Sequence, residues 1–246
     1  MSELIIKNFS ASTNNNKIIS EVNLRIKSGE IHIIMGPNGS GKTTFAKAIM
    51  KYPKLKTSGN IILDGKDITS LSTDKKAKLG LFLQFQNPAE INDIKYINFL
   101  YNAYTSIKKS GNIEDLENEI EVNLKRLNLK KDIIERDLNF RFSGGEKKKM
   151  EILQMLILNP KFAILDEPDS GLDVDAIKKM AEIIKEALKK KKIGVILITH
   201  YNKIISYIKP DFVHVLVNGK IVASGKESIA KEIETEGFEK YIKNKV

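Results

Sequence analysis

Gly36-Pro37-Asn38-Gly39-Ser40-Gly41-Lys42-Thr43-Thr44 is the stretch that decides the fold of this 246-residue chain. It fits the pattern G-x-x-x-x-G-K-[ST], in which glycines let backbone N–H groups turn inward around phosphate oxygens at the start of a helix. The pattern directs Lys42 to the β- and γ-phosphates and the Thr43 hydroxyl to Mg²⁺. The apolar run 31–35 before it predicts a buried strand, and residues 44–50 after it predict a helix. The sequence therefore predicts a nucleoside triphosphate site.

Two carboxylates follow another apolar run. Residues 162–165 predict a buried strand, and Asp166 and Glu167 come directly after it. At the carboxyl end of a parallel sheet, we expect Asp166 to meet the same Mg²⁺ through water. We expect Glu167 to face the γ-phosphate and polarise an attacking water. A solvated acidic turn is the alternative, but tandem acids beside a phosphate loop favour hydrolysis over binding alone.

Ser143-Gly144-Gly145-Glu146 predicts a second helix start, with Ser143 as the N-cap and Glu146 at capping-box spacing. The N–H groups of such a helix start also suit a phosphate. Because the chain already has one phosphate loop, we expect this second anion site to serve a nucleotide held by another copy. A capping box with no further role is the alternative.

The rest of the chain alternates strand-like and helix-like segments. Strands are predicted at 4–9, 18–26, 59–65, 81–85, 195–198 and 212–217, with a polar turn cluster at 10–16. Helices are predicted at 114–127, 143–158 and 176–188, with a polar helix over about the last dozen residues. This alternation predicts a parallel α/β sheet in which the region around 87–158 is inserted as a helical lobe.

Composition excludes several classes of function. The chain has no cysteine, which excludes disulfides, thiol catalysis and Cys-ligated clusters within it. No uncharged apolar window reaches membrane-spanning length and no secretory signal is visible, so we expect a cytoplasmic protein without membrane insertion. The net charge is +10, but arginines are few and aromatics are not interleaved with them. We therefore expect a solvated, lysine-rich surface, including the runs 147–149 and 189–192, and no nucleic-acid partner.

In their order along the whole chain, these motifs resemble those of the ATP-binding-cassette (ABC) ATPases. Residues 36–43 match the Walker A loop of that family, and Gln86 after the strand 81–85 matches its Q-loop glutamine. Further along, 143–146 match the signature motif, 164–167 the Walker B strand, 170–173 the D-loop, and Thr199-His200 the switch histidine.

The resemblance implies one ABC ATPase domain over 1–246, a P-loop NTPase that hydrolyses ATP with Mg²⁺. It implies a RecA-like parallel-sheet core in 1–86 and 159–246, an N-terminal antiparallel β region, and a helical subdomain in 87–158. It adds Gln86 as a catalytic and metal residue, His200 at the γ-phosphate and Asp173 at the nucleotide. It also implies an ATP-dependent head-to-tail homodimer, with each ATP between one Walker A loop and the partner's signature motif.

Two features depart from transporter cassettes. Phe142 and Glu146 stand where such cassettes usually have leucine and glutamine. The loop 10–17 holds no aromatic residue for stacking on adenine, and the alternation around Phe9 places that ring in the core. What stacks on the base is therefore left open.

Several stretches resemble one branch of the family, the SufC-type ATPases of SUF iron–sulfur cluster assembly. They are 80–91, 142–149, 151–155, 169–173, Tyr201 and 209–216, with Pro168 as a departure that is more usual in transporters. The resemblance implies a soluble SufB- or SufB/SufD-type scaffold as the partner, docked within 86–107. That segment holds more apolar and aromatic residues than a surface helix needs, although part of it must be core. An ATP-binding subunit of a membrane transporter is the alternative. A non-hydrolysing nucleotide-gated scaffold is disfavoured by Glu167 and His200.

Overall fold

The computed structural model describes residues 1–14, 16–108, 112–199 and 202–243, and its centre is a six-stranded sheet in the order β12-β11-β3-β10-β9-β6. The strands of this sheet are β3 (Ile31–Met35), β6 (Leu81–Gln84), β9 (Phe162–Asp166), β10 (Gly194–Ile198), β11 (Phe212–Val217) and β12 (Lys220–Gly225). All neighbouring pairs are parallel except β11 with β12. The predicted parallel α/β sheet is therefore confirmed, and β12 adds an antiparallel edge that the sequence analysis did not predict.

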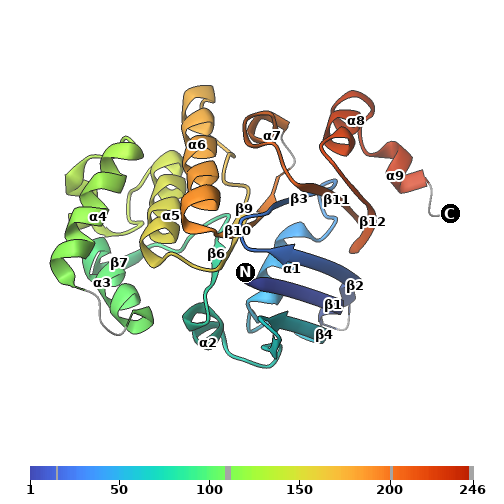
Figure 1. The fold of residues 1–246 in the computed structure, drawn as a ribbon, viewed down its shortest axis with the longest axis horizontal. Coiled ribbons are helices and arrows are strands. Elements are labelled where there is room, and N and C mark those ends of the chain that lie inside the picture. The colour runs from blue at the N-terminus through green and yellow to red at the C-terminus, as the bar shows by residue number, and fades with distance from the viewer. Residues whose placement is uncertain (15, 109–111, 200–201, 244–246) are drawn as a thin grey trace.

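A second, antiparallel sheet has the order β2-β1-β4-β5 and lies on one side of the central sheet (Figure 1). Its strands are β1 (Glu3–Thr13), β2 (Asn16–Lys27), β4 (Lys56–Leu63) and β5 (Lys66–Asp67). The prediction of a polar turn over 10–16 is wrong, because β1 continues to Thr13. Ala11 is buried opposite Ile19 of β2, so burial and strand pairing extend the strand through a polar sequence.

Helix α1 (Lys42–Ile49) packs between the two sheets. Its apolar residue Phe45 is fully buried and meets Phe9 of β1 edge to face, with the ring centroids 6.3 Å apart. Phe9 is therefore a core residue, as its alternation predicted. This packing fixes the helix that begins at the end of the glycine-rich loop.

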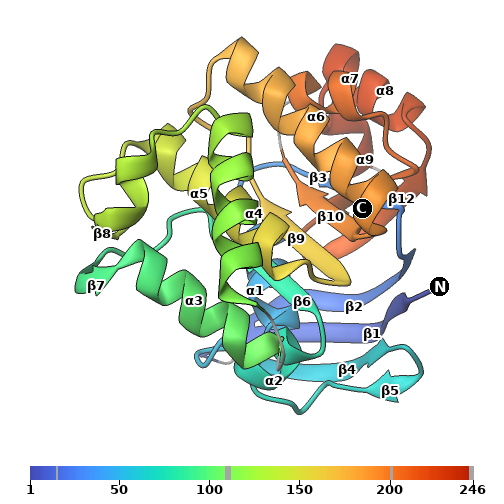
Figure 2. The same ribbon diagram turned by 60° about the vertical axis from the view of Figure 1, so that its left-hand side comes forward.

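Between β6 and β9 the chain forms a group of helices at the far end of the molecule from β1 and β2 (Figures 1 and 2). The group contains α3 (Tyr96–Ile107), α4 (Ile113–Arg126), the 3₁₀ helix η1 (Lys131–Glu135) and α5 (Gly144–Leu158). It also contains a two-stranded antiparallel sheet of β7 (Ile91–Lys95) and β8 (Asp137–Leu138), which corrects the purely helical prediction for this region. Every residue of β7 is exposed, so its sequence carries no alternating burial signal.

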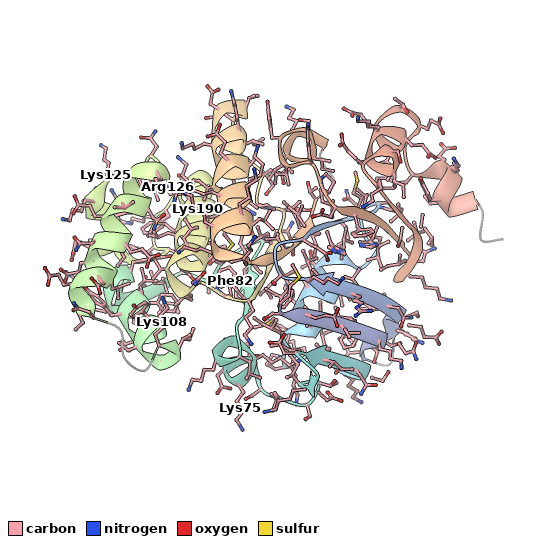
Figure 3. All side chains as sticks on the ribbon, in the orientation of Figure 1. Lys75, Phe82, Lys108, Lys125, Arg126 and Lys190 are labelled. Carbon is pink, nitrogen blue, oxygen red and sulfur yellow. The ribbon has the colours of Figure 1, made fainter. Side chains whose placement is uncertain are left out.

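The remaining helices are α2 (Thr73–Lys78), α6 (Val174–Lys191), α7 (Asn202–Ile208), α8 (Ser228–Glu236) and α9 (Glu239–Lys243). The described part of the predicted terminal helix is α9, whereas α8 was not predicted and ends just before Gly237, whose φ is +72°. Figure 3 shows Lys75 and Lys125 extending outward from α2 and α4, as expected for solvated lysines, and Lys190 of α6 is also exposed. Within the described ranges, no helix is long and apolar enough to cross a membrane.

Candidate functional site

The glycine-rich loop lies between the end of β3 and the start of α1. At Gly36 any side chain is excluded, because a Cβ there would lie 2.1 Å from the Leu216 carbonyl oxygen of β11. Gly41, the residue before α1, has a φ of +103° that favours glycine. These constraints expose the first N–H groups of α1 at the loop, where the positive end of the helix dipole favours an anion.

Lys42 closes the loop on itself. Its Nζ donates hydrogen bonds to the carbonyl oxygens of Gly36 (2.7 Å) and Pro37 (3.0 Å). Burial lowers the pKa of Lys42, while the carboxylates of Glu167 and Asp166 act in the opposite direction. A cavity of about 360 Å³ lies beside this loop. Its lining is formed by Ile18, the seven residues 38–44, Gln86 and Glu167.

Asp166 at the end of β9 has the properties of a metal ligand. It is almost fully buried, and burial raises its pKa although a hydrogen bond with the Thr43 side chain lowers it. Among the described residues, nothing hydrogen-bonds to its Oδ1 atom. Leaving a carboxylate oxygen buried and unsatisfied is costly, and oxygen ligands of this kind are those that Mg²⁺ prefers. The pair of Asp166 and Thr43 therefore fits a magnesium ion.

Glu167 and Gln86 are in direct contact. Gln86 Nε2 donates a 2.7 Å hydrogen bond to Glu167 Oε2. Glu167 has a φ of +51°, and its backbone N–H donates to the carbonyl of Ile198 at 2.8 Å. A non-glycine residue with positive φ is held there by its surroundings, which here include β10. The structure thus brings Glu167, which the sequence analysis expected to face the γ-phosphate, into contact with Gln86, which it expected to be a catalytic and metal residue.

Ser143 caps α5 with the predicted capping box. Its Oγ accepts from the Glu146 N–H at 3.2 Å, and its own N–H donates to Glu146 Oε2 at 2.8 Å. Ser143 and Gly144 are exposed, and within the described chain neither they nor Gly145 line the cavity at the glycine-rich loop. The start of α5 is therefore exposed to solvent and does not line the cavity at the glycine-rich loop of its own chain.

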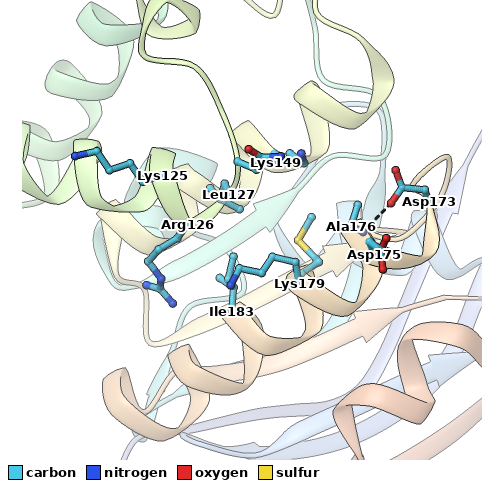
Figure 4. Close-up of a pocket in the computed structure, with 11 residues that line it drawn as sticks. Lys125, Arg126, Leu127, Lys149, Asp173, Asp175, Ala176, Lys179 and Ile183 are labelled. Carbon is cyan, nitrogen blue, oxygen red and sulfur yellow. Dashed lines mark hydrogen bonds between the residues drawn. The ribbon is translucent and has the colours of Figure 1, made fainter.

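Asp173 also lies away from the loop cavity. It is the N-cap of α6, where its Oδ1 accepts from the Ala176 N–H at 2.8 Å. Figure 4 shows it beside a second cavity of about 360 Å³ between α4, α5 and α6, with Lys149 and Lys179 nearby. The structure thus places Asp173 at a helix start rather than against the loop. His200 and Tyr201, both named in the sequence analysis, lie outside the described residues.

Two residues near the site were missed by the sequence analysis. Lys148 was included in a run of solvated lysines, which is wrong, because its side chain is buried and its Nζ donates to the Glu167 carbonyl at 2.6 Å. Glu151, one turn later, is also buried and accepts from the Phe85 N–H at 3.1 Å. The available signal was charge within a stretch of helix that is otherwise largely apolar, since Met150, Ile152 and Leu153 adjoin these positions in the sequence.

Comparisons with known proteins match the chain to one family. A family model described as ABC transporter matches residues 19–170. The probable ATP-dependent transporter ycf16 of Cyanophora paradoxa is 43% identical over 96% of this chain and 93% of its own length. Vegetative protein 296 of Bacillus subtilis (strain 168) is 42% identical over 97% of this chain and 92% of its own length.

The fold is similar to solved structures as well. A dimeric ATP-binding cassette in a post-hydrolysis state, bound to ADP and Pi, has a TM-score of 0.78 with this chain. The likeness covers 91% of this chain and 98% of that one at 22% identity, so it bears on the fold alone.

Proposed function

The chain belongs to the ABC family of ATPases, and we propose that it is the ATPase of a SufBCD-type complex, in which ATP-driven dimerisation drives a conformational change in an iron–sulfur cluster assembly scaffold. As an ABC ATPase, it hydrolyses ATP to ADP and phosphate. The observation that carries the finer proposal is the resemblance to the SUF branch at 80–91, 142–149 and 151–155. The absence of cysteine is in keeping with an ATPase that drives a scaffold without holding the cluster itself.

The residues of the loop cavity have distinct roles in this proposal. Lys42 leaves its two loop carbonyls to bind the β- and γ-phosphates of ATP. Glu167 polarises the attacking water, and Gln86 connects the γ-phosphate end of the site to the segment that follows it. His200 is included on sequence alone, as a γ-phosphate contact.

Mg²⁺ is held by Thr43 and Asp166, with Gln86 as a further ligand. The orphaned Oδ1 of Asp166 supports this assignment, since a buried carboxylate oxygen without a hydrogen-bond partner is suited to a cation. When bound, the metal supplies positive charge at the phosphate oxygens.

A head-to-tail homodimer completes each site. Ser143 and Gly144 are exposed and lie apart from the loop cavity of their own chain. In the dimer, the start of α5 in one copy faces the ATP held by the glycine-rich loop of the other copy. The helix dipole of α5 then acts on the γ-phosphate from the opposite side to α1.

The scaffold docks on the segment after Gln86, where the sequence analysis expected part of the apolar and aromatic residues to be core and the rest to be exposed. Tyr96 and Tyr104 are buried in the core of the helical region. Large exposed apolar residues of this region are Ile91 (41% exposed) and Ile94 (43%) on β7, with Phe85 (37%) directly after β6. The two exposed isoleucines lie on the segment that follows Gln86 in the chain, and they suit an interface anchor connected to the nucleotide site through that segment.

The experiment that tests this function is purification of the natural complex without detergent, followed by mass spectrometry and an ATPase assay with and without the partner. We expect a soluble SufB- or SufD-type scaffold that raises the ATPase rate. Recovery of the chain only from detergent extracts, bound to an integral membrane permease, would replace this proposal with an ATP-binding subunit of a transporter.

A further inference from the structure

Glu151 is a carboxylate buried inside the helical part of the molecule, in the middle of α5. Only 4% of its surface is exposed, and burial raises its pKa to about 7. Removing a carboxylate from water costs free energy that an apolar residue at the same position would not. A buried carboxylate at this position therefore indicates that Glu151 makes a contact that an apolar residue could not make.

That contact is with the backbone of the segment leading to Gln86. Glu151 Oε2 accepts a 3.1 Å hydrogen bond from the N–H of Phe85, the residue directly before Gln86. Phe85 follows the last residue of β6, so its N–H has no strand partner on the sheet edge that ends there. The carboxylate replaces the missing ladder partner and fixes the direction in which the chain leaves the sheet.

One turn earlier on the same helix, Lys148 reaches the other member of the catalytic pair. Its Nζ donates to the Glu167 carbonyl at 2.6 Å, while the Glu167 side chain accepts from Gln86 at 2.7 Å. α5 thus holds both ends of the Gln86–Glu167 contact, one through Lys148 and one through Glu151. The same helix begins at Ser143, the residue proposed to face the ATP of a second copy.

The surroundings of Glu151 are built to hold it in place. Tyr96 of α3 donates its hydroxyl to the Met150 carbonyl at 2.8 Å, and Gln154 Nε2 donates to the Tyr96 oxygen at 2.7 Å. Burial raises the pKa of Glu151, whereas the Phe85 N–H, Lys148 and Gln154 each act to lower it. The carboxylate is therefore one member of a buried polar network with defined partners.

We propose that Glu151 is a positioning residue for ATP hydrolysis, which holds the Phe85 amide to α5 and thereby sets Gln86 against Glu167. When the ATP of a second copy contacts Ser143 in a dimer and moves α5, the hydrogen bond between Glu151 and Phe85 transmits that movement to Gln86. This inference rests on the roles proposed above for Gln86 and Glu167.

The test compares three variants in the full chain. Glu151→Gln keeps an oxygen acceptor on a side chain of the same length. Glu151→Leu keeps the volume and removes the acceptor. Met155→Ala, one turn further along α5, creates a buried cavity, leaves the Glu151 carboxylate in place and controls for loss of stability.

Two measurements are made on each variant: kcat and KM for ATP, and hydrogen–deuterium exchange of the peptide containing Phe85. We expect Glu151→Leu to speed exchange at Phe85 and to lower kcat, each about tenfold, with KM unchanged. We expect Glu151→Gln to recover most of kcat and of the protection, and Met155→Ala to keep both.

The inference is overturned if Glu151→Leu speeds exchange at Phe85 but retains wild-type kcat, or if Met155→Ala lowers kcat equally. An unchanged exchange rate at Phe85 in Glu151→Leu also overturns it, because the hydrogen bond from Phe85 to Glu151 would then not protect that amide. A parallel Glu167→Gln chain separates this failure from that of the proposed function. Wild-type hydrolysis by Glu167→Gln contradicts the catalytic roles, whereas the exchange at Phe85 still reports on Glu151.

Discussion

His32 and His214 stack on neighbouring parallel strands of the central sheet, with His32 Nδ1 3.0 Å from His214 Nε2 and the ring centroids 5.3 Å apart. The contact requires one nitrogen to donate and the other to accept, so it is lost when both rings are protonated. Glu30 lies 3.2 Å from the far side of His32, and Ser224 lies 2.8 Å from the far side of His214. Asp211 and Lys226 are the other charged groups that act on His32.

We predict that this pair makes the fold acid-sensitive. Burial, followed by the nearby His32, lowers the pKa of His214 from 6.5 to about 4. Between pH 6.5 and pH 4, His214 is therefore protonated in the unfolded chain but neutral in the folded chain. The free energy of unfolding falls as the pH falls through this range. Between pH 7 and pH 5 the free energy of unfolding should fall by about 2 kcal/mol from this site.

Urea denaturation at pH 7 and pH 5 measures this loss. The His214→Gln chain has no titrating group at that position, so its loss over the same interval should be smaller by about 2 kcal/mol. Because the free energies of unfolding at pH 7 and pH 5 are compared within the same chain, any pH-independent destabilisation caused by the substitution cancels. Equal losses in the two chains would show that the acid sensitivity arises elsewhere.

Lys42 and Glu167 should fail in different ways when they are replaced. Lys42→Ala removes the charge proposed for the phosphates and should weaken ATP binding by at least about tenfold. Glu167→Gln should bind ATP normally but hydrolyse it at least about a hundredfold more slowly. Equilibrium binding of a fluorescent ATP analogue and single-turnover hydrolysis separate the two effects. A wild-type rate in Glu167→Gln would disprove the water-polarising role.

The proposed dimer should form in the hydrolysis-deficient chain. With ATP and Mg²⁺, we expect Glu167→Gln to elute from a size-exclusion column as a dimer, since ATP is retained between the copies. Adding Ser143→Arg places a bulky cation at the start of α5 and should abolish that dimer. Asn118→Arg on the exposed face of α4 adds the same charge elsewhere and should leave the dimer intact. A dimer that persists with Ser143→Arg would exclude the head-to-tail arrangement.

The β7 surface should determine scaffold binding. Ile91→Glu combined with Ile94→Glu introduces charge into the proposed interface and should weaken scaffold binding by about thirtyfold or more, with ATP affinity unchanged. The matched control replaces Ile113 and Val122 of α4, which are more exposed (58% and 57%), by glutamate. Calorimetric titration of the purified scaffold measures both. Normal scaffold binding by the β7 variant would show that the docking site is not on β7.

Local sequence was sufficient to predict the parts of the site that depend on backbone geometry. The glycine-rich loop and the capping box at Ser143 use residue types at fixed spacing, and the structure shows both where they were predicted. The extended β1 was missed, because Ser10 and Ser12 are in a strand through pairing and not through their own propensity.

The roles of Lys148 and Glu151 depend on contacts between distant segments and could not be predicted in this way. Lys148 looks like its neighbours Lys147 and Lys149, but its side chain is buried and reaches the carbonyl of Glu167, a residue of a distant segment. Glu151 has its partner at Phe85, 66 positions earlier in the chain. Periodicity identifies the buried face of a helix, but it does not reveal which backbone groups on other elements need a partner there.

The arrangement of β3 in the central sheet has a consequence for the order in which the molecule is assembled. β3 carries the glycine-rich loop, and its two neighbours are β10 (Gly194–Ile198) and β11 (Phe212–Val217). During synthesis, the loop leaves the ribosome long before either neighbour exists, and these distant pairings make the sheet slow to close. Since the Leu216 carbonyl lies against Gly36, the loop acquires its final support only after residue 216 has emerged. A nascent chain that already contains the whole phosphate-binding motif therefore still lacks the phosphate-binding site.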